Sequence, residues 1–278
     1  MLSTAQVDHF QTFGFVVLRG ALAKHAAVLE AEVDAAIHDA YNTTFDERIV
    51  DGISGHYLPM ASRLTPISAS LICDDTRLVD IAEQLLGAPA LPECPEGVLY
   101  FYEADWHNDD GIGVRGVKFA AYFDELTADR GALRFLPGSH HPDYHERLAD
   151  YRRQMCLAAS DGRPEAGRAT FPGHVVDTVP GDVVAFDLHT WHAGFGGRDR
   201  LAWTIVYQRR PENDHQRQRT LRSMADSFEQ AFRGFDRDRY PIWRDWVAEA
   251  GSHLRHAQMV ERLRADGVLD LPGSDIGW

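Results

Sequence analysis

The sequence contains few cysteines, and none is arranged to bind a structural metal. Only Cys73, Cys94 and Cys156 are present, and no two of them form a C-x-x-C pair. Three irregularly spaced cysteines are too few for a disulfide framework, and structural zinc sites usually require closely paired cysteines. We therefore expect a cytoplasmic protein whose stability comes from a hydrophobic core.

Long apolar runs and an excess of positive charge are also missing. No segment approaches the ~20 apolar residues that cross a bilayer, and the first residues lack the basic and apolar segments of a signal peptide. Lys plus Arg number 28 against 42 Asp plus Glu, a formal net charge of −14. Nucleic acids and anionic membranes attract cationic surfaces, so we expect neither as a partner. The sequence does not indicate which oligomeric state the protein adopts.

The 278 residues, 44% of them hydrophobic, predict a single domain of about 1–278 with a substantial core. Ser3 and Gln6 form a capping-box pattern that predicts a helix to about Phe13. A strand at 14–18 and helices at 21–40 and 75–86 complete a helical N-terminal part of about 1–90. Within it, the apolar residues of 41–72 have no regular spacing, so we expect this segment to be irregular. A helical C-terminal extension covers about 213–278.

Between these parts, a core of about 95–210 has short runs rich in Val, Phe, Tyr and Trp, separated by Gly, Pro and Asp. We expect strands near 98–102, 115–124, 132–136, 174–179, 183–188 and 201–208. Such strands without regular intervening helices are typical of a double-stranded β-helix, the jelly roll of cupin-like barrels. The predicted fold class is therefore mainly β with flanking helices (α+β).

His107 and Asp109 form an H-x-D motif. Residues i and i+2 of a strand point to the same side, so one segment can offer an imidazole and a carboxylate to a metal. Asp110 is an alternative carboxylate, although alternation favours Asp109. Two histidines and one carboxylate bind Fe(II) on one face and leave other positions open.

The second histidine must come from a distant strand. His189 and His192 both follow the predicted strand 183–188. The glycines after His192, beginning with Gly194, leave room for a ligand close to the backbone. We therefore predict His192 as the ligand and His189 as a neighbouring or surface residue.

Two cations stand on strand-like runs. Arg200 begins the run 200–207, and a buried arginine there requires an anionic partner, for which a bidentate carboxylate is well suited. A salt bridge within the protein is the alternative, and Arg198 is a weaker candidate because it lies in a loop. Lys118 either points inward and pairs with an anion or lies at a solvated edge.

The sequence resembles the phytanoyl-CoA dioxygenase family of Fe(II)- and 2-oxoglutarate-dependent oxygenases. The resemblance covers about residues 3–210 and rests on three segments. One is the opening helix and strand through Gly20, and another is the His107–Asp109, His192 and Arg200 frame. The most specific is the stretch from Gly131 to His140, which is close to the family's G-A-L-x-x-x-P-G-S-H signature; we expect His140 itself to be structural.

The resemblance implies a catalytic site in which His107, Asp109 and His192 bind iron and Arg200 binds 2-oxoglutarate. Gly194 occupies a position where the family often has a serine, so another donor must assist Arg200; the candidates are Lys118, Tyr100 and Arg63. Such enzymes use O2 and release succinate and CO2, and the presence of Asp109 favours hydroxylation over halogenation.

Three further residues are candidates for binding a small-molecule substrate: Trp106, Arg63 and Arg115. Arg63, Arg115 and Lys118 suggest that this substrate is anionic. Two other functions remain open. A cupin-like metal enzyme would use no keto acid and form no succinate, and a non-catalytic jelly-roll protein would bind no 2-oxoglutarate at all.

Overall fold

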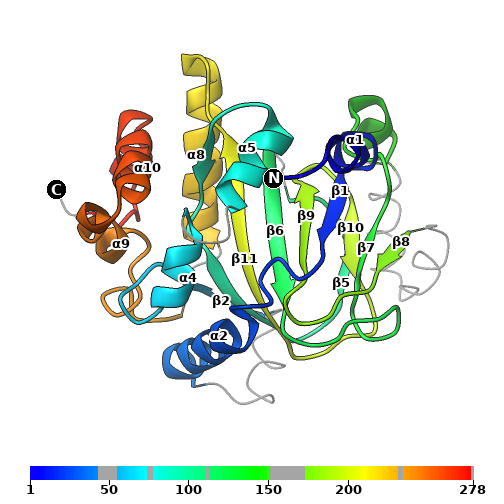
Figure 1. The fold of residues 1–278 in the computed structure, drawn as a ribbon, viewed down its shortest axis with the longest axis horizontal. Helices are drawn as coiled ribbons and strands as arrows, with labels where there is room; N and C mark the ends of the chain where they lie inside the picture. Colours follow the sequence, from blue (N-terminus) through cyan, green and yellow to red (C-terminus); the bar gives the residue numbers. More distant parts are fainter. Residues whose placement is uncertain are drawn as a thin grey trace.

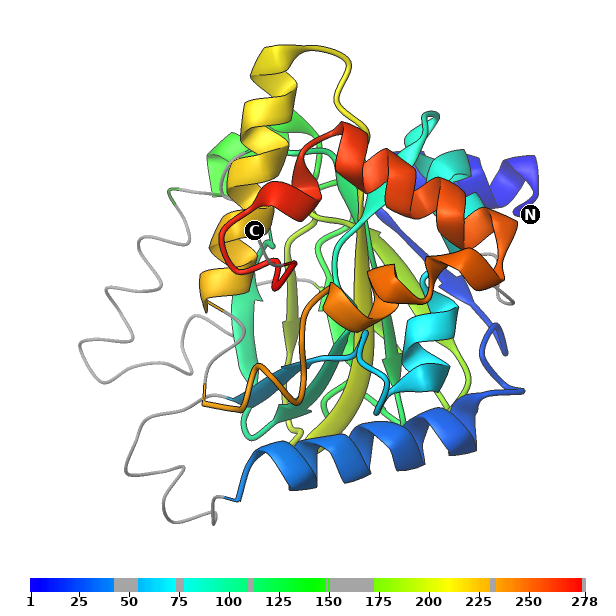
Figure 2. The same ribbon diagram turned by 90° about the vertical axis from the view of Figure 1, so that its left-hand side faces the viewer.

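The fold consists of two antiparallel sheets that face one another, with most of the helices on the outer side of the larger sheet (Figures 1 and 2). The computed structural model describes residues 1–42, 55–73, 78–109, 113–148, 150, 173–230 and 234–276. Cys156, Asp110 and Asp75, the start of the helix expected at 75–86, lie outside these ranges. Two facing antiparallel sheets of this kind form a jelly roll, and the predicted fold class is confirmed.

The N-terminal elements follow the predicted pattern at their start. Helix α1 (Thr4–Phe13) has the complete capping box of Ser3 and Gln6, and it ends at Gly14, whose φ of 86° is left-handed. Strand β1 (Phe15–Leu18) follows. Helix α2 (Ala26–Ala40) begins five residues later than predicted, because residues 21–25 form turns.

The segment expected to be irregular contains two regular elements, so that prediction is wrong in part. Strand β2 (Gly55–Pro59) is ordered by pairing with a distant strand, which no local pattern encodes. Helix α4 (Pro66–Leu71) has a proline at its first position, a residue that favours helix starts. Helix α5 (Leu78–Leu86) then packs against the larger sheet.

The larger sheet has the order β1-β9-β6-β11-β4-β2, and β3 also pairs with β11. Its remaining strands are β3 (Ala90–Pro92), β4 (Glu96–Tyr100), β6 (Gly116–Tyr122), β9 (Val183–Asp187) and β11 (Arg200–Arg209). The smaller sheet has the order β5-β10-β7-β8, from β5 (Ala104–His107), β10 (His192–Gly194), β7 (Leu133–Phe135) and β8 (His174–Val176).

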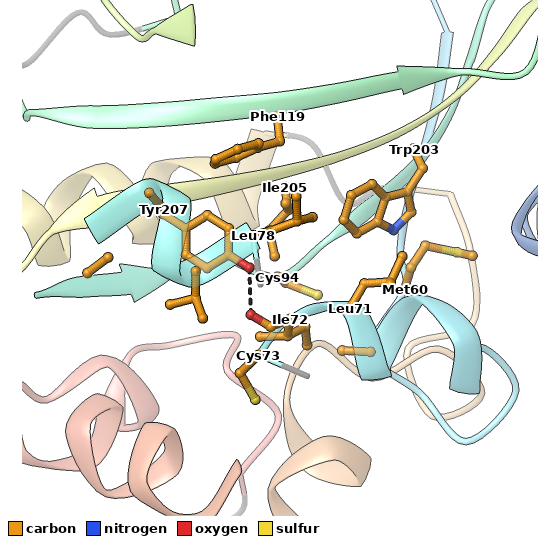
Figure 3. Close-up of a cluster of buried hydrophobic side chains, with 14 of the residues drawn as sticks. Met60, Leu71, Ile72, Cys73, Leu78, Cys94, Phe119, Trp203, Ile205 and Tyr207 are labelled. Atoms are coloured by element: carbon orange, nitrogen blue, oxygen red, sulfur yellow. Dashed lines mark hydrogen bonds between the residues drawn. The ribbon is translucent and has the colours of Figure 1, made fainter. Parts of the chain in front are cut away.

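Strand β11 lies within the larger sheet and separates two environments. Its outer side carries Trp203, Ile205 and Tyr207 into the core beneath the helices, where Tyr207 donates a hydrogen bond of 2.5 Å to the carbonyl of Ile72 (Figure 3). Its inner side carries Arg200 and every second residue after it toward the smaller sheet. The larger sheet therefore has one face for stability and one for the site.

The C-terminal part is helical, as predicted, and packs on the outer core. It contains α8 (Asp214–Gln230), α9 (Arg244–Ala248) and α10 (Leu254–Ala265), with short 3-10 turns η1 (Ala250–Ser252) and η2 (Val268–Asp270). Trp243 and Trp246 are buried in the same cluster as Trp203. None of the helices in the described ranges is long and apolar enough to cross a membrane.

Candidate metal and co-substrate site

The two predicted histidine ligands are cross-strand partners in the smaller sheet. His107 on β5 lies opposite His192 on β10, and their ring centroids are 4.2 Å apart. His192 is almost completely buried, whereas a third of the His107 side chain is exposed. The pairing of two short strands therefore brings together two residues that are 85 positions apart in the sequence.

Asp109 completes the cluster. Its Oδ1 atom lies 3.6 Å from Nε2 of His107 and 3.6 Å from Nε2 of His192. The three side chains can each direct one ligand atom at a common point, with all three atoms within 4.8 Å of one another. This arrangement suits a metal ion bound on one face.

Backbone carbonyls orient both imidazoles. Nδ1 of His107 lies 2.6 Å from the carbonyl oxygen of Asp105, and Nδ1 of His192 lies 2.9 Å from that of Thr190. A proton on Nδ1 satisfies each carbonyl and leaves the Nε2 lone pair directed at the cluster. Burial, together with the neighbouring His107, lowers the pKa of His192 to about 3, so this imidazole is neutral near pH 7.

Asp109 is held in its ionised form. Burial alone would raise its pKa, but the charge of Lys118 and its hydrogen bond to the carboxylate hold the pKa well below the ordinary value. The ammonium of Lys118 lies 3.0 Å from Oδ2, which leaves Oδ1 for the cluster. Of the two orientations predicted for Lys118, the structure has the inward one, paired with an anion.

Arg200 is buried, and no carboxylate is paired with it among the described residues. Its Nη1 donates to the carbonyl of Gly131 at 2.8 Å and its Nη2 to that of Tyr102 at 3.1 Å. Nε is buried and lacks a partner within the described ranges. The guanidinium lies near the rings of Tyr100 and Tyr122, at 5.2 and 5.8 Å from their centroids. A buried cation in these surroundings favours binding of an external anion.

Gly194 explains how the arginine fits. A Cβ atom at this position would lie 2.9 Å from Nη1 of Arg200, closer than real Cβ contacts allow. Gly131 is similarly close, since its Cβ would lie 2.5 Å from Cδ of Arg200. A serine at position 194 would therefore collide with the guanidinium, and the departure from the family pattern accommodates Arg200.

A cavity of about 570 Å³ contains the whole cluster and Arg200. Its lining includes Trp106, Lys118, Tyr100 and Gly194 of the predicted site residues. Trp106 is also packed in a small core with Trp191, so it contributes to both. The cavity size is in the range of small-molecule binding sites.

Other predicted residues lie elsewhere. Arg63 is largely exposed beside Glu249, and Arg115 lines a separate pocket with other arginines, so neither lines this cavity. His189 is bonded to Asp187 and is outside the cluster. Arg198 was the weaker of the two arginine candidates. Its guanidinium lies 5.7 Å from the centroid of the Tyr102 ring.

Sequence reasoning missed several cavity residues. They share positions on the inner face of the larger sheet or on helix α8: Tyr57, Glu93, Glu96, Tyr122, Ser223 and Ser227. Tyr122 was detectable, because strand alternation places it on the same side as Lys118. The glutamates depend on long-range pairing, because Glu96 lies opposite Thr204 and Glu93 follows β3, which pairs with the end of the same strand β11.

The signature from Gly131 to His140 has a structural role. Ser139 is fully buried, and its Oγ accepts a hydrogen bond of 2.8 Å from the backbone N–H of Trp191. His140 lies 3.1 Å from the carbonyl of Gln11 through its Nε2 atom. The signature therefore anchors the start of β10 and ties it to helix α1.

The jelly roll and its two-histidine, one-carboxylate cluster define the class of metal-binding barrels that includes non-haem iron oxygenases. Residues 10–199 match the model of the family described as Phytanoyl-CoA dioxygenase (PhyH), and the chain belongs to this family.

Individual relatives are more distant. The chain is 29% identical over 159 residues to L-proline trans-4-hydroxylase of Streptomyces griseoviridis, which covers 48% of this chain and 59% of that protein. Among solved structures, it is similar to the non-heme alpha ketoglutarate dependent carbocyclase SnoK from nogalamycin biosynthesis. The TM-score is 0.56 and the sequence identity 20%, and the match covers 75% of this chain and 85% of SnoK. It is also similar to EctD from S. alaskensis with 2-oxoglutarate and 5-hydroxyectoine. The TM-score is 0.55 and the sequence identity 24%, and the match covers 75% of this chain and 77% of EctD. At these identities, the structural likeness establishes a shared fold.

Proposed function

We propose that residues 1–278 form one oxygenase domain, a non-haem Fe(II)- and 2-oxoglutarate-dependent dioxygenase. It hydroxylates an unactivated C–H bond of a small molecule with O2, and succinate and CO2 are the co-products. The observation that carries this proposal is that one cavity contains the His107–Asp109–His192 cluster and a buried Arg200 that has no carboxylate partner among the described residues.

The donor atoms fit both groups. Two neutral imidazoles and an ionised carboxylate are the ligand set of non-haem Fe(II) sites. The guanidinium of Arg200 has no carboxylate partner among the described residues, and its buried Nε has no acceptor there. A dicarboxylate with one end on the metal and the other on Arg200 would satisfy both requirements.

In this site, His107, Asp109 and His192 would hold the iron, and Arg200 would hold the distal carboxylate of the co-substrate. The bound iron and 2-oxoglutarate would supply O2 activation coupled to oxidative decarboxylation. Lys118 fixes one oxygen of Asp109 so that the other faces the cluster. The apolar wall residues Leu133, Phe186 and Leu188 exclude water and restrict where a substrate C–H bond can lie.

The substrate is a small molecule in this proposal. The hydroxylase named above acts on L-proline according to its name, and the cavity volume is in the range of small-molecule binding sites. The predicted anionic character rested on three cations, of which Arg63 and Arg115 do not line the cavity and Lys118 is paired with Asp109. These cations therefore give little support to an anionic substrate.

The cytoplasmic location stays a prediction.

The experiment is an anaerobic titration of the purified protein with Fe(II) and 2-oxoglutarate, followed by visible spectroscopy. We expect the weak charge-transfer band of the iron chelate in the wild type. Asp109→Ala should abolish the band, because a metal ligand is lost. Arg200→Ala should require at least about tenfold more 2-oxoglutarate to produce it, since a charged hydrogen-bonding partner is removed. Arg222→Ala, at an exposed position on α8, is the matched control.

Normal iron binding without a band in the wild type would contradict the proposal. In that case the cupin-like enzyme without a keto acid, or the non-catalytic binding protein, would explain the site better. Equal co-substrate affinity in Arg200→Ala and the wild type would remove the role assigned to Arg200.

A further inference from the structure

One part of the cavity is acidic, and the proposed chemistry does not use it. Glu93 follows β3 and Glu96 begins β4, and both line the cavity together with Ser223 and Ser227 of α8. Glu96 lies opposite Thr204 in the sheet, four residues along β11 from Arg200. At about 3.3 Å per residue, these positions are roughly 13 Å apart. The acidic part is thus separate from the place where Arg200 would hold the co-substrate.

Both glutamates have hydrogen-bond donors but no cation in contact. Glu96 Oε2 accepts from the hydroxyl of Thr204 at 3.0 Å. Glu93 Oε1 accepts from the side-chain amide of Gln208 at 2.6 Å. No ion pair involves either residue within the described ranges. The nearest ammonium, that of Lys118, is bonded to Asp109.

Burial makes these two charges costly. It raises the pKa of Glu93 to about 7 and also raises the pKa of Glu96, and the Lys118 charge only partly offsets this effect. Two carboxylates that line one cavity repel each other, and burial weakens the hydration that would stabilise their charges. A cation bound between them would remove both penalties, whereas a neutral hydroxyl compound would leave the charges uncompensated.

A further acceptor without a donor lies beside them. Gln208 is fully buried, and its side chain leaves β11 on the same side as the cavity-lining Thr204 and Val206. Its amide nitrogen is bonded to Glu93 and Ser223, but its Oε1 has no hydrogen-bond partner among the described residues. This part of the cavity therefore has acceptors in excess of donors.

We propose that Glu96 and Glu93 bind a cationic nitrogen group of the substrate, such as an ammonium or amidinium. The inference rests on the proposed function and adds the substrate class. Arg200 and the acidic pair would sort the two organic ligands by charge: the dicarboxylate binds at the arginine, and the cation binds at the glutamates. The reacting C–H bond then lies between the glutamates and the His107–Asp109–His192 cluster.

The test uses pyrrolidine, a secondary ammonium near pH 7, and the neutral cyclopentanol as its control. Zn(II) replaces iron, so that the protein saturated with 2-oxoglutarate binds ligand without turnover. Saturation-transfer NMR titrations give the Kd of each compound. We expect wild-type protein to bind pyrrolidinium at least about tenfold more tightly than cyclopentanol, because buried charge-assisted hydrogen bonds distinguish the two.

Variants locate the binding to the glutamates. Glu96→Gln and Glu93→Gln should each weaken pyrrolidinium binding about tenfold and leave cyclopentanol binding nearly unchanged. Glu96→Asp should retain part of the preference for the cation, which a purely structural role would not predict. Glu261→Gln, an exposed helix residue paired with Arg264, is the matched loss of charge elsewhere.

No pyrrolidinium binding, equal affinity for both compounds, or unchanged selectivity in Glu96→Gln would each overturn this inference. The visible band of the iron chelate tests the proposed function separately. A protein with the band but without cation selectivity would keep the oxygenase assignment and lose the substrate class. A protein without the band would lose the oxygenase assignment itself.

Discussion

At the scale of single residues, the co-substrate site depends on how closely the backbone approaches Arg200. Gly194→Ala would place a methyl group 2.9 Å from Nη1 and displace the guanidinium. We expect the KM for 2-oxoglutarate to rise about three- to tenfold with a smaller change in kcat, because ground-state binding is what is lost. Steady-state succinate assays measure this. Gly251→Ala, where the added methyl group contacts nothing within 4 Å, is the control; an unchanged KM in Gly194→Ala would contradict the account.

Glu93 should make the stability of the metal-free protein depend on pH. Its pKa is raised from the ordinary 4.5 to about 7, so the folded protein holds this proton more tightly than the unfolded chain. Stability is therefore lost as the pH rises from 4.5 to 7, by up to about 3 kcal/mol. Glu96, Lys118 and Gln208 are the groups that face this carboxylate.

Glu93→Gln removes that titration. Urea unfolding at pH 5 and pH 8 should show the variant gaining stability relative to the wild type at the higher pH, and Glu261→Gln serves as the surface control. A difference between Glu93→Gln and wild type that is the same at both pH values would show that Glu93 titrates normally.

The residues of the candidate metal site could be predicted from the sequence, but their surroundings could not. The H-x-D spacing, the histidine after a buried strand and the strand arginine each carry a local pattern, and the structure brings these residues together. Glu93 and Glu96 carry no such pattern, because they reach the cavity through the pairing of β3 and of β4 with β11. Arg63 has a charge suited to the predicted role, yet its position beside Glu249 depends on tertiary packing.

At the scale of elements, the short strand β10 depends on an anchor outside itself. Ser139→Ala removes the buried acceptor for the N–H of Trp191, which immediately precedes β10. An unsatisfied buried N–H costs about 1–3 kcal/mol, so urea unfolding should show a loss of that size. The affinity for Fe(II) should fall as well, because Trp191 immediately precedes the predicted ligand His192.

The comparison variant is Ser70→Ala, whose hydroxyl bonds the carbonyl of Ile67 in its own helix. Its effect should stay within about 0.5 kcal/mol, with iron affinity unchanged. If Ser139→Ala bound iron as tightly as the wild type, the signature would not position the ligand strand.

Most strands were predictable, including the three-residue strands β7 and β8 near 132–136 and 174–179, but three other short strands were not. The predicted runs at 115–124, 183–188 and 201–208 correspond to β6, β9 and β11, in which apolar residues recur over several positions. Strands β3, β5 and β10 have three or four residues, too few for a period, and they exist because a partner strand supplies their hydrogen bonds.

At the scale of the whole molecule, stability and chemistry lie on opposite faces of the larger sheet. Helices α9 and α10 belong to the stabilising side, because Trp243 and Leu263 are fully buried in the outer core, whereas α8 also contributes Ser223 and Ser227 to the cavity lining. Of the possible roles of this extension as a lid, a dimer face or a packing element, burial of Trp243 and Trp246 favours packing.

Trp243→Ala should therefore lower the free energy of unfolding by about 3–5 kcal/mol, the usual cost of removing a buried tryptophan. Calorimetry or urea unfolding measures the loss, and Leu254→Ala, at a position that is 77% exposed on α10, is the control. The folded fraction should keep the visible iron band with wild-type affinity for 2-oxoglutarate. A large change in that affinity with little loss of stability would indicate a lid instead.

The central claim is that this jelly roll couples Fe(II) and 2-oxoglutarate to O2. The most direct measurement is uncoupled turnover: purified protein with Fe(II), 2-oxoglutarate, O2 and ascorbate as the two-electron reductant, followed by quantification of succinate and of the O2 consumed above a protein-free control. We predict Fe(II)-dependent succinate formation that matches O2 consumption in the wild type and is lost in Asp109→Ala. Failure of the wild type to form succinate, with iron bound at the His107–Asp109–His192 cluster, would contradict the account.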